Sequence, residues 1–238
     1  MKISVLMPVY ATPVEWLRQA VESIIYQNHP NFQFIIVDDN NPRGPVTDYL
    51  YGLTQRDCCI NIVRKSSNEG IAAALNFGLQ HCKGDLIVRM DADDVANAEL
   101  LKVHEQFFTT HADRHICGVQ IHLFNDKTDW FSTHPTVITR ERALAMPGHW
   151  FVNHPGVAYR NAAIKAVGGY DNTPPALAED YALWIRFLMA GYAIYNREEV
   201  LMDYRVHPKS FSFAPDRKSS QWHQFLTDQK NLLNEQRN

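Results

Sequence analysis

The chain has 238 residues, of which 45% are hydrophobic, so it can bury one sizeable core and is too apolar to be disordered. Its 23 basic and 26 acidic residues give a formal charge of −3, which excludes the strongly basic surface of a nucleic-acid-binding protein. The apolar N-terminal run stops at Pro8, and no later run approaches the length of a membrane span. We therefore expect a soluble cytoplasmic protein, and peripheral contact with the inner face of the cytoplasmic membrane stays open.

Strands and helices alternate through the first hundred residues. Short apolar runs predict buried strands at residues 3–7, 34–37, 60–63 and 86–90, and helical spacing of apolar residues predicts helices at 13–27 and 71–82. A polar turn with Pro42, Gly44 and Pro45 follows the second strand. This alternation is typical of a parallel sheet covered on both faces, which binds ligands beyond the carboxyl ends of its strands.

The second half of the chain is less regular. The sequence predicts helices at residues 97–110 and 178–190, strands at 116–124 and 152–159, and an extended segment at 200–206. A polar helix is expected at the end of the chain, from about residue 216 to 238. Residues 131–150 fit no pattern, and we expect a mobile loop there.

The stretch "RMDADDV", residues 89–95, places three carboxylates within four residues, directly after an apolar strand. Asp91 and Asp93 stand two positions apart, and carboxylates at this spacing can direct oxygens at one Mg²⁺ or Mn²⁺ ion. The alternative is a solvated acidic turn before a helix that begins at Ala96. The position at the end of a parallel strand favours the metal site.

Other motifs fit less well or are missing. "DADDV" matches the D-x-D-x-[TV] pattern of aspartyl-nucleophile phosphatases, although their motif follows the first strand of the domain and this one follows the fourth. An EF-hand is disfavoured, because Ala96 and Lys102 would take the places of its glycine and its last glutamate. The chain has no glycine-rich dinucleotide or P-loop motif, and its four cysteines lack zinc-ligand spacing.

Three further places hold candidate site residues. Asp38 and Asp39 end the second predicted strand, where a carboxylate can bind a ribose hydroxyl or a base N–H, or can simply form a turn. Glu179 and Asp180 open a predicted helix, where they are either catalytic or favourable to the helix dipole. His207 follows an extended segment and is either a metal ligand or a structural residue.

Together these segments resemble one enzyme family. The chain contains, in order, Pro8-Val9-Tyr10, Asp38-Asp39, "NEGIAAALNFGL", "GDLIVRMDADD", "NHPGVAYR", "GGYD", "EDYALWIRFLMAGY" and "YRVHPKSFS". Over about residues 2–213 this series resembles the family 2 glycosyltransferases of the GT-A fold. It is most similar to bacterial enzymes that build O-antigen, capsule or other exopolysaccharide.

The resemblance implies an α/β fold of the GT-A type in a single domain over residues 1–238. A Rossmann-like nucleotide-sugar-binding half with a central, mostly parallel sheet (1–98) would be fused to a smaller acceptor-binding and catalytic half (99–215), followed by a helical tail (216–238). The implied reaction is an inverting transfer of a hexose or N-acetylhexosamine from a nucleotide-diphosphate sugar to a hydroxyl of a saccharide or lipid-linked saccharide. A UDP-sugar is favoured as the donor, with galactose slightly preferred.

The resemblance also implies a role for each matching residue. Asp180 would be the catalytic base. The nucleotide-sugar would contact Pro8, Tyr10, Asp38, Asp39, Asn68, Gly70 and Asp91. Mn²⁺ or Mg²⁺ would bind Asp93, with Asp91 and His207 as further metal-site residues. The acceptor would contact His154, Gly169, Tyr170, Glu179 and Trp184.

Two positions depart from the family pattern. Leu75 stands where many relatives have an arginine, and Val95-Ala96-Asn97 replaces the proline and arginine that often follow the aspartates. Both departures leave the identity of the transferred sugar open. The alternative functions are a metal-dependent phosphatase or nucleotidyltransferase, and a sugar- or nucleotide-binding module without turnover.

Overall fold

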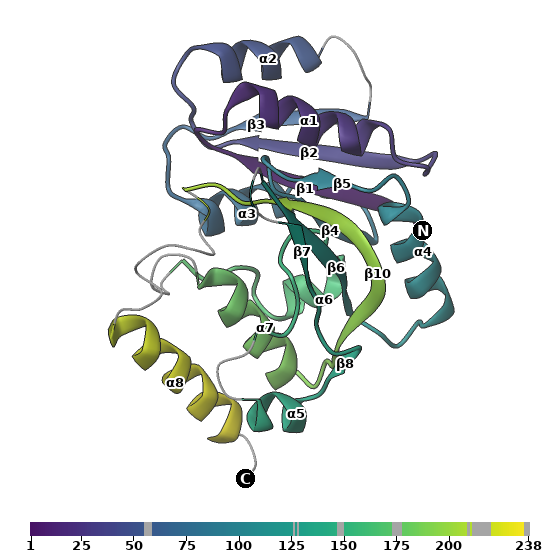
Figure 1. Cartoon of the computed structure of the whole chain (residues 1–238), viewed down its shortest axis with the longest axis vertical. Helices are drawn as coiled ribbons and strands as arrows, with labels where there is room; N and C mark the ends of the chain where they lie inside the picture. The colour runs from purple at the N-terminus through teal and green to yellow at the C-terminus, as the bar shows by residue number, and fades with distance from the viewer. Residues whose placement is uncertain are drawn as a thin grey trace.

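A single mixed sheet runs through the protein (Figure 1). The computed structural model describes residues 1–54, 59–125, 127, 129–146, 150–172, 178–208, 210 and 220–235. Ten strands form the sheet, in the order β3-β2-β1-β4-β9-β6-β10-β5, with β7 paired to β6 and β8 paired to β10. The expected α/β architecture is confirmed.

The first half of the chain forms the parallel part of this sheet. Its strands are β1 (Ile3–Val9), β2 (Phe32–Asp38), β3 (Ile60–Arg64) and β4 (Leu86–Arg89), and all pair in parallel. The helices are α1 (Val14–Ile25), α2 (Pro45–Leu53) and α3 (Ile71–Leu79). All four strands and two of the helices match the sequence prediction. The helix α2 was missed, because Pro42, Gly44 and Pro45 indicated only a turn, whereas Pro45 begins the helix.

Strand β1 shows how the sequence covers both faces of the sheet. Val5 and Met7 pack into one core with residues of α1 and α2, while Leu6, on the opposite face, packs into the core that contains α3. Gly78 lets α3 approach this second face closely, since a Cβ atom there would lie 2.3 Å from Cδ1 of Leu6. The carboxyl ends of β1, β2 and β4 are thereby held side by side between two layers of helices.

The second half adds the parallel pair β6 and β10, several short antiparallel strands and the remaining helices. Its elements are β5 (Val95–Ala96), α4 (Leu100–Thr110), β6 (Ile116–Phe124), β7 (Asp129–Ser132), β8 (Val137–Ile138), α5 (Arg140–Ala145), β9 (Ala158–Arg160), α6 (Asn161–Ala166), α7 (Glu179–Met189), β10 (Ile194–Arg205) and α8 (Ser220–Glu235). The predictions of β6, α7, the extended segment in β10 and the terminal helix α8 are confirmed.

Three expectations for this half were wrong. The helix expected at residue 96 begins at Leu100, because Val95–Ala96 form a short strand that pairs with β10. The strand expected at 152–159 is limited to Ala158–Arg160, which pairs with β4. The segment 131–150 was expected to be a loop, but it contains the end of β7, β8 and α5. Residues 147–149, 216–219 and 236–238, which also fall within predicted segments, lie outside the described residues.

Strand β10 runs from the start of β6 to the short strand β5 that follows the aspartates. Its first residues pair with the start of β6, and its last residues pair with β5, the strand that follows the three aspartates (Figure 1). The residues after β10 therefore return to the carboxyl end of β4. No helix among the described residues is long and apolar enough to cross a membrane.

Candidate active site

The end of β2 is tied to the end of β1 by a network around Asp38. Oδ1 of Asp38 accepts hydrogen bonds from the backbone and the side-chain amide of Asn41, both at 2.8 Å, and Oδ2 pairs with Arg64. Asn41 also donates to the carbonyl of Val9 at 2.9 Å and accepts from the backbone N–H of Ala11 at 2.8 Å. These contacts orient the strand ends, which supports a turn-forming role for Asp38 beside the expected nucleotide pocket.

Asp39 lies against a buried lysine. Its Oδ1 is 2.8 Å from Nζ of Lys65, whose side chain also lies 2.9 Å from Oε2 of Glu69. Burial alone would lower the pKa of Lys65, but the hydrogen bonds and charges of Asp39 and Glu69 raise it, so the lysine stays protonated. Lys65 therefore orients the carboxylate of Asp39, which can also accept a hydrogen bond from a ligand.

The other expected nucleotide-binding residues surround this carboxylate. Pro8 lies in β1 opposite Val37, and Tyr10 follows the strand with 53% of its surface exposed. The side-chain amide of Asn68 donates to the carbonyl of Asp39 at 3.4 Å, and Gly70 begins α3 with a φ of 86°. The left-handed backbone at Gly70 favours glycine, and no heavy atom lies within 4 Å of the position of its missing Cβ. The loop before α3 thus stays open next to Asp39.

The first of the three aspartates after β4 already has a cationic partner. Asp91 pairs with Arg89, whose guanidinium is buried beneath the site. Burial raises the pKa of Asp91, Arg89 opposes this shift, and the charges of Asp93 and Asp180 increase it. Arg89 also exchanges backbone hydrogen bonds with Gly156 and Val157, and His154 of the same segment lies 4.0 Å from Glu179, the residue before the expected base.

The third aspartate ties the loop to β10. Asp94 is fully buried, and its Oδ1 accepts the backbone N–H of Arg205 at 2.8 Å. The Nε of Arg205 donates to the carbonyl of Asp93 at 2.8 Å, and its Nη2 lies 2.5 Å from Oε1 of Gln19. Burial raises the pKa of Asp94 well above its ordinary value, and the charges of Asp93 and Asp91 raise it further. Asp94 and Arg205, neither among the predicted site residues, hold the loop in place.

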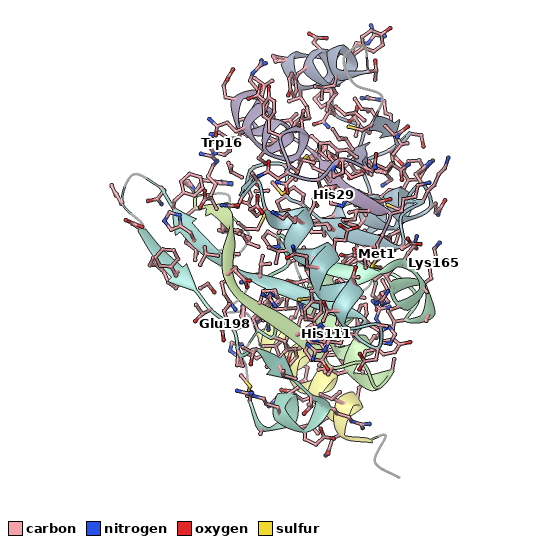
Figure 2. The ribbon with its side chains drawn as sticks, turned by 90° about the vertical axis from the view of Figure 1, so that its right-hand side faces the viewer. Met1, Trp16, His29, His111, Lys165 and Glu198 are labelled. Carbon is pink, nitrogen blue, oxygen red and sulfur yellow. The ribbon has the colours of Figure 1, made fainter. Side chains whose placement is uncertain are left out.

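Asp93 faces the histidine that follows β10. Its Oδ2 lies 2.9 Å from Nε2 of His207, and the imidazole ring packs on Trp16 with 4.8 Å between ring centroids. Figure 2 labels Trp16 on the side of the molecule where β10 ends, and the guanidinium of Arg205 lies 5.2 Å from the centre of its ring. The structure therefore brings together two of the residues expected at the metal site.

The donor atoms of Asp93 and His207 fit a divalent cation. Their side chains are 32% and 15% exposed, so both can be reached from solvent. Among the described residues, no group of three or more His, Cys, Asp or Glu side chains is arranged to hold a metal ion. A cation bound to Asp93 and His207 would take its other ligands from a diphosphate and water, as Mg²⁺ does in many nucleotide sites.

The expected catalytic residues begin helix α7. Asp180 is 6% exposed; its Oδ1 accepts the backbone N–H of Tyr181 at 2.7 Å, and its Oδ2 accepts the indole N–H of Trp150 at 3.1 Å. Glu179 is 8% exposed, and its Oε1 lies 4.0 Å from Nδ1 of His154. Burial raises the pKa of Glu179 to about 7, Asp180 contributes in the same direction, and Arg89 opposes it.

The expected acceptor-binding residues form a buried layer next to Arg89. Nε2 of His154 lies 2.9 Å from Oη of Tyr170, which lies 3.1 Å from Oη of Tyr159. Burial lowers the pKa of His154 well below its ordinary value, so the ring is neutral. Trp184 is fully buried and packs edge-on against His154 at 5.7 Å. Trp184 therefore supports His154, and contact of either ring with an acceptor stays a prediction.

Gly169 connects this layer to the nucleotide-binding half. A Cβ atom at Gly169 would lie 2.7 Å from Oδ1 of Asn76, the same atom that accepts the backbone N–H of Tyr170 at 2.8 Å. The side-chain amide of Asn76 donates to the carbonyl of Tyr170 at 2.8 Å, and Arg186 donates to the carbonyl of Gly169 at 2.6 Å. The "GGYD" turn is thus fixed between α3 and α7.

Sequence reasoning missed several side chains that shape this site. These are Asn41, Lys65, Arg89, Asp94, Trp150 and Arg205. Arg89 carried a signal, since it is a charged residue at the end of an apolar strand and directly before an acidic cluster, whereas Lys65 follows an apolar strand without such a cluster beside it. Trp150 lies in the segment that matched no pattern, so its contact with Asp180 had no sequence signal.

Comparison with known proteins identifies the family of the chain. The family model described as glycosyl transferase family 2 matches residues 4–168. An Escherichia coli protein named UDP-Gal:alpha-D-GlcNAc-diphosphoundecaprenol beta-1,3-galactosyltransferase is 33% identical over 210 residues, which cover 86% of this chain and 74% of that protein.

Solved glycosyltransferases share the fold. Staphylococcus aureus TarS (residues 1–349), solved in complex with UDP-GlcNAc, superimposes with a TM-score of 0.72 at 18% identity and covers 90% of this chain. The mannosyltransferase PcManGT of Pyrobaculum calidifontis, solved with GDP-Man and Mn²⁺, gives a TM-score of 0.68 at 16% identity over 88% of this chain. The chain spans 61% of the TarS chain and 58% of the PcManGT chain, and these similarities establish the GT-A fold.

Proposed function

The chain belongs to glycosyl transferase family 2, and we propose that it is an inverting, metal-dependent hexosyl- or N-acetylhexosaminyltransferase of bacterial surface polysaccharide synthesis. One observation carries this proposal. The carboxyl edge of the sheet holds the Asp39 carboxylate and the Asp93–His207 pair, and the segment that contains His154 links Arg89 at this edge to the start of α7, where Asp180 lies. Such an arrangement suits a nucleotide, a diphosphate and a reacting hydroxyl in one crevice.

The proposed donor is a UDP-sugar. Asp39 is oriented by Lys65, and its carboxylate can accept a hydrogen bond from the N–H of a uracil ring or from a ribose hydroxyl. The name of the E. coli relative specifies UDP-Gal, and TarS was solved with UDP-GlcNAc, whereas PcManGT was solved with GDP-Man. We favour UDP because the relative of highest identity among these three uses it, and galactose for the same reason.

Asp180 is proposed to act as the general base. The acceptor hydroxyl attacks the anomeric carbon on the face opposite the diphosphate and loses its proton to the Asp180 carboxylate. The bond between the anomeric carbon and the diphosphate oxygen breaks, and its electron pair leaves with the nucleotide. A divalent cation held by Asp93 and His207, either Mn²⁺ or Mg²⁺, would supply positive charge to the departing diphosphate.

The acceptor is proposed to be a saccharide or a lipid-linked saccharide. Its binding surface would be built on the layer of His154, Tyr170 and Glu179, with Gly169 and Trp184 behind it. The E. coli relative is named for a diphosphoundecaprenol-linked acceptor. A lipid-linked acceptor would bring this enzyme into peripheral contact with the inner face of the cytoplasmic membrane.

A donor screen tests the proposal directly. The protein would be incubated with Mn²⁺, an acceptor such as a lipid-diphosphate-linked N-acetylglucosamine, and each of the common UDP-sugars, and UDP and phosphate would be measured separately. Transferase activity releases UDP, a phosphatase releases phosphate, and a binding module releases neither. The pairing of Asp91 with Arg89 speaks against a phosphatase, because a buried arginine partner weakens Asp91 as a nucleophile.

A further inference from the structure

Trp150 makes a direct hydrogen bond to the proposed base. Its indole N–H donates to Oδ2 of Asp180 at 3.1 Å, while the backbone N–H of Tyr181 donates to Oδ1 at 2.7 Å. One donor thus contacts each carboxylate oxygen, and the two together fix the rotation of the carboxylate about its Cβ–Cγ bond. A carboxylate has about four acceptor positions, so these two donors do not exhaust its capacity to receive a proton.

The indole of Trp150 is itself held by the C-terminal helix α8. Its ring stacks on Trp222 of α8 with 5.7 Å between centroids and 14° between planes, and it packs against Tyr181 at 5.2 Å. Trp222 is 5% exposed, so this aromatic stack is shielded from solvent. The Nε of Arg140 in α5 donates to the carbonyl of Leu233 at 2.7 Å and fastens the other end of α8 (Figure 1).

We propose that Trp150 is a positioning residue that orients the Asp180 carboxylate for proton abstraction, and that α8 holds Trp150 in place through the Trp150–Trp222 stack. The proposal rests on the proposed role of Asp180 as the base. It assigns a catalytic purpose to the C-terminal helix α8.

The hydrogen bond from Trp150 has two consequences for the reaction. It restricts the carboxylate to one orientation. A fixed carboxylate favours transfer of the proton from the acceptor hydroxyl, as other positioning contacts do. It also stabilises the ionised form of Asp180, because a donor to a carboxylate lowers its pKa. Loss of the donor therefore slows transfer at neutral pH and moves the acidic limb of the kcat profile to higher pH.

Trp150→Phe tests the proposal, because phenylalanine keeps an aromatic ring next to Trp222 and removes the N–H together with part of the indole ring system. We expect kcat at pH 7 to fall about tenfold, and the acidic limb to move up by about one pH unit, as for loss of a hydrogen bond to a charged group. The dissociation constant for UDP, measured by calorimetry, should stay unchanged. Trp130→Phe is the matched control, since Trp130 lies on β7 with 52% of its surface exposed.

A second variant keeps the test decisive if Trp150→Phe folds poorly. Trp222→Ala retains the N–H but removes its support, and we expect a smaller change of kcat and of the acidic limb in the same directions. The proposal would be overturned if both variants had the kcat and the pH profile of the wild type. It would also be overturned if they showed a lower melting temperature without any shift of the acidic limb of the kcat–pH profile.

The double variant separates this proposal from the proposed function. If Trp150 acts through Asp180, adding Trp150→Phe to Asp180→Asn causes no further loss of transfer. A further tenfold loss in the double variant would overturn the positioning role. Near-normal transfer by Asp180→Asn alone would instead refute the role of Asp180, whatever the Trp150 variants do.

Discussion

Nε2 of His207 lies 2.9 Å from Oδ2 of Asp93, although 114 residues separate the two in the chain. Strand β10 creates this contact, because its last residues pair with β5 directly after the aspartate loop. The side chain and backbone of Arg205 then hold the loop from the same strand. The pair that we propose to bind the metal is thus assembled from residues that follow two different strands.

Asp93→Ala should nearly abolish transfer. The variant removes the carboxylate that faces His207, and with it the charge stabilisation of the diphosphate, so we expect a rate loss on the order of 10³-fold. EDTA should have the same effect on the wild-type enzyme. Asp129→Ala is a suitable control, since that carboxylate is 88% exposed on β7 and should leave the rate unchanged. Full wild-type activity in EDTA would rule out the metal.

His207→Ala should change the metal preference of the enzyme. Imidazole binds Mn²⁺ better than Mg²⁺, so the wild type should be more active with Mn²⁺, and the variant should lose most of this preference. If His207 only packs on Trp16, the variant will show a lower melting temperature and an unchanged ratio of Mn²⁺ to Mg²⁺ activity.

Asp39→Ala should weaken nucleotide binding and destabilise the fold together. We expect UDP affinity, measured by calorimetry, to fall about tenfold or more. The variant also leaves the buried Lys65 with Glu69 as its acidic partner, so the free energy of unfolding should fall by about 1–3 kcal/mol. Glu69→Gln is the matched control and should have a small effect on both quantities. An unchanged UDP affinity in Asp39→Ala would assign this residue to structure alone.

The raised pKa of Glu179 should make the free energy of unfolding depend on pH. Burial raises the pKa of Glu179 to about 7 in the folded state, above its ordinary value of 4.5. The folded protein then binds more protons than the unfolded chain between these values, so this group stabilises the fold at low pH and loses that contribution as pH rises through 7. Glu179→Gln should therefore be about 1–3 kcal/mol more stable than the wild type at pH 8, with a smaller difference at pH 5. Equal unfolding curves at both values of pH would contradict this account.

Periodicity predicted the parallel half of the fold well. Apolar runs such as Ile3–Val9 and Phe32–Asp38 are buried on both faces, so the sequence pattern and the final environment agree. Prediction was poorer where pairing between distant segments decides the structure. Val95–Ala96 form a strand rather than the start of a helix only because β10 lies beside them, and β7 exists only through its pairing with β6.

In the candidate site, too, individual residues were predicted better than the contacts between distant segments. Family resemblance named Asp93, His207 and Asp180, and the structure places Asp93 beside His207. Their partners could not be predicted, because contacts such as Trp150 to Asp180 and Lys65 to Asp39 depend on tertiary packing and leave no local pattern. The sequence singled out Asp91 and Asp93 of "DADD" but gave no partner for any of the three carboxylates, and the structure pairs Arg89 with Asp91 and Arg205 with Asp94. Only Asp93 faces His207.

The central claim is that Asp180 is the base of an inverting glycosyl transfer, and a single comparison tests it most directly. Wild-type protein and Asp180→Asn would be assayed with Mn²⁺, a UDP-α-sugar donor and a saccharide acceptor, with UDP release followed over time and the product linkage determined by NMR. The account predicts a β-linked product from the wild type, equal UDP affinity in both proteins, and a transfer rate about 10²–10⁴-fold lower in Asp180→Asn. Near-normal turnover by Asp180→Asn, or an α-linked product from the wild type, would contradict it.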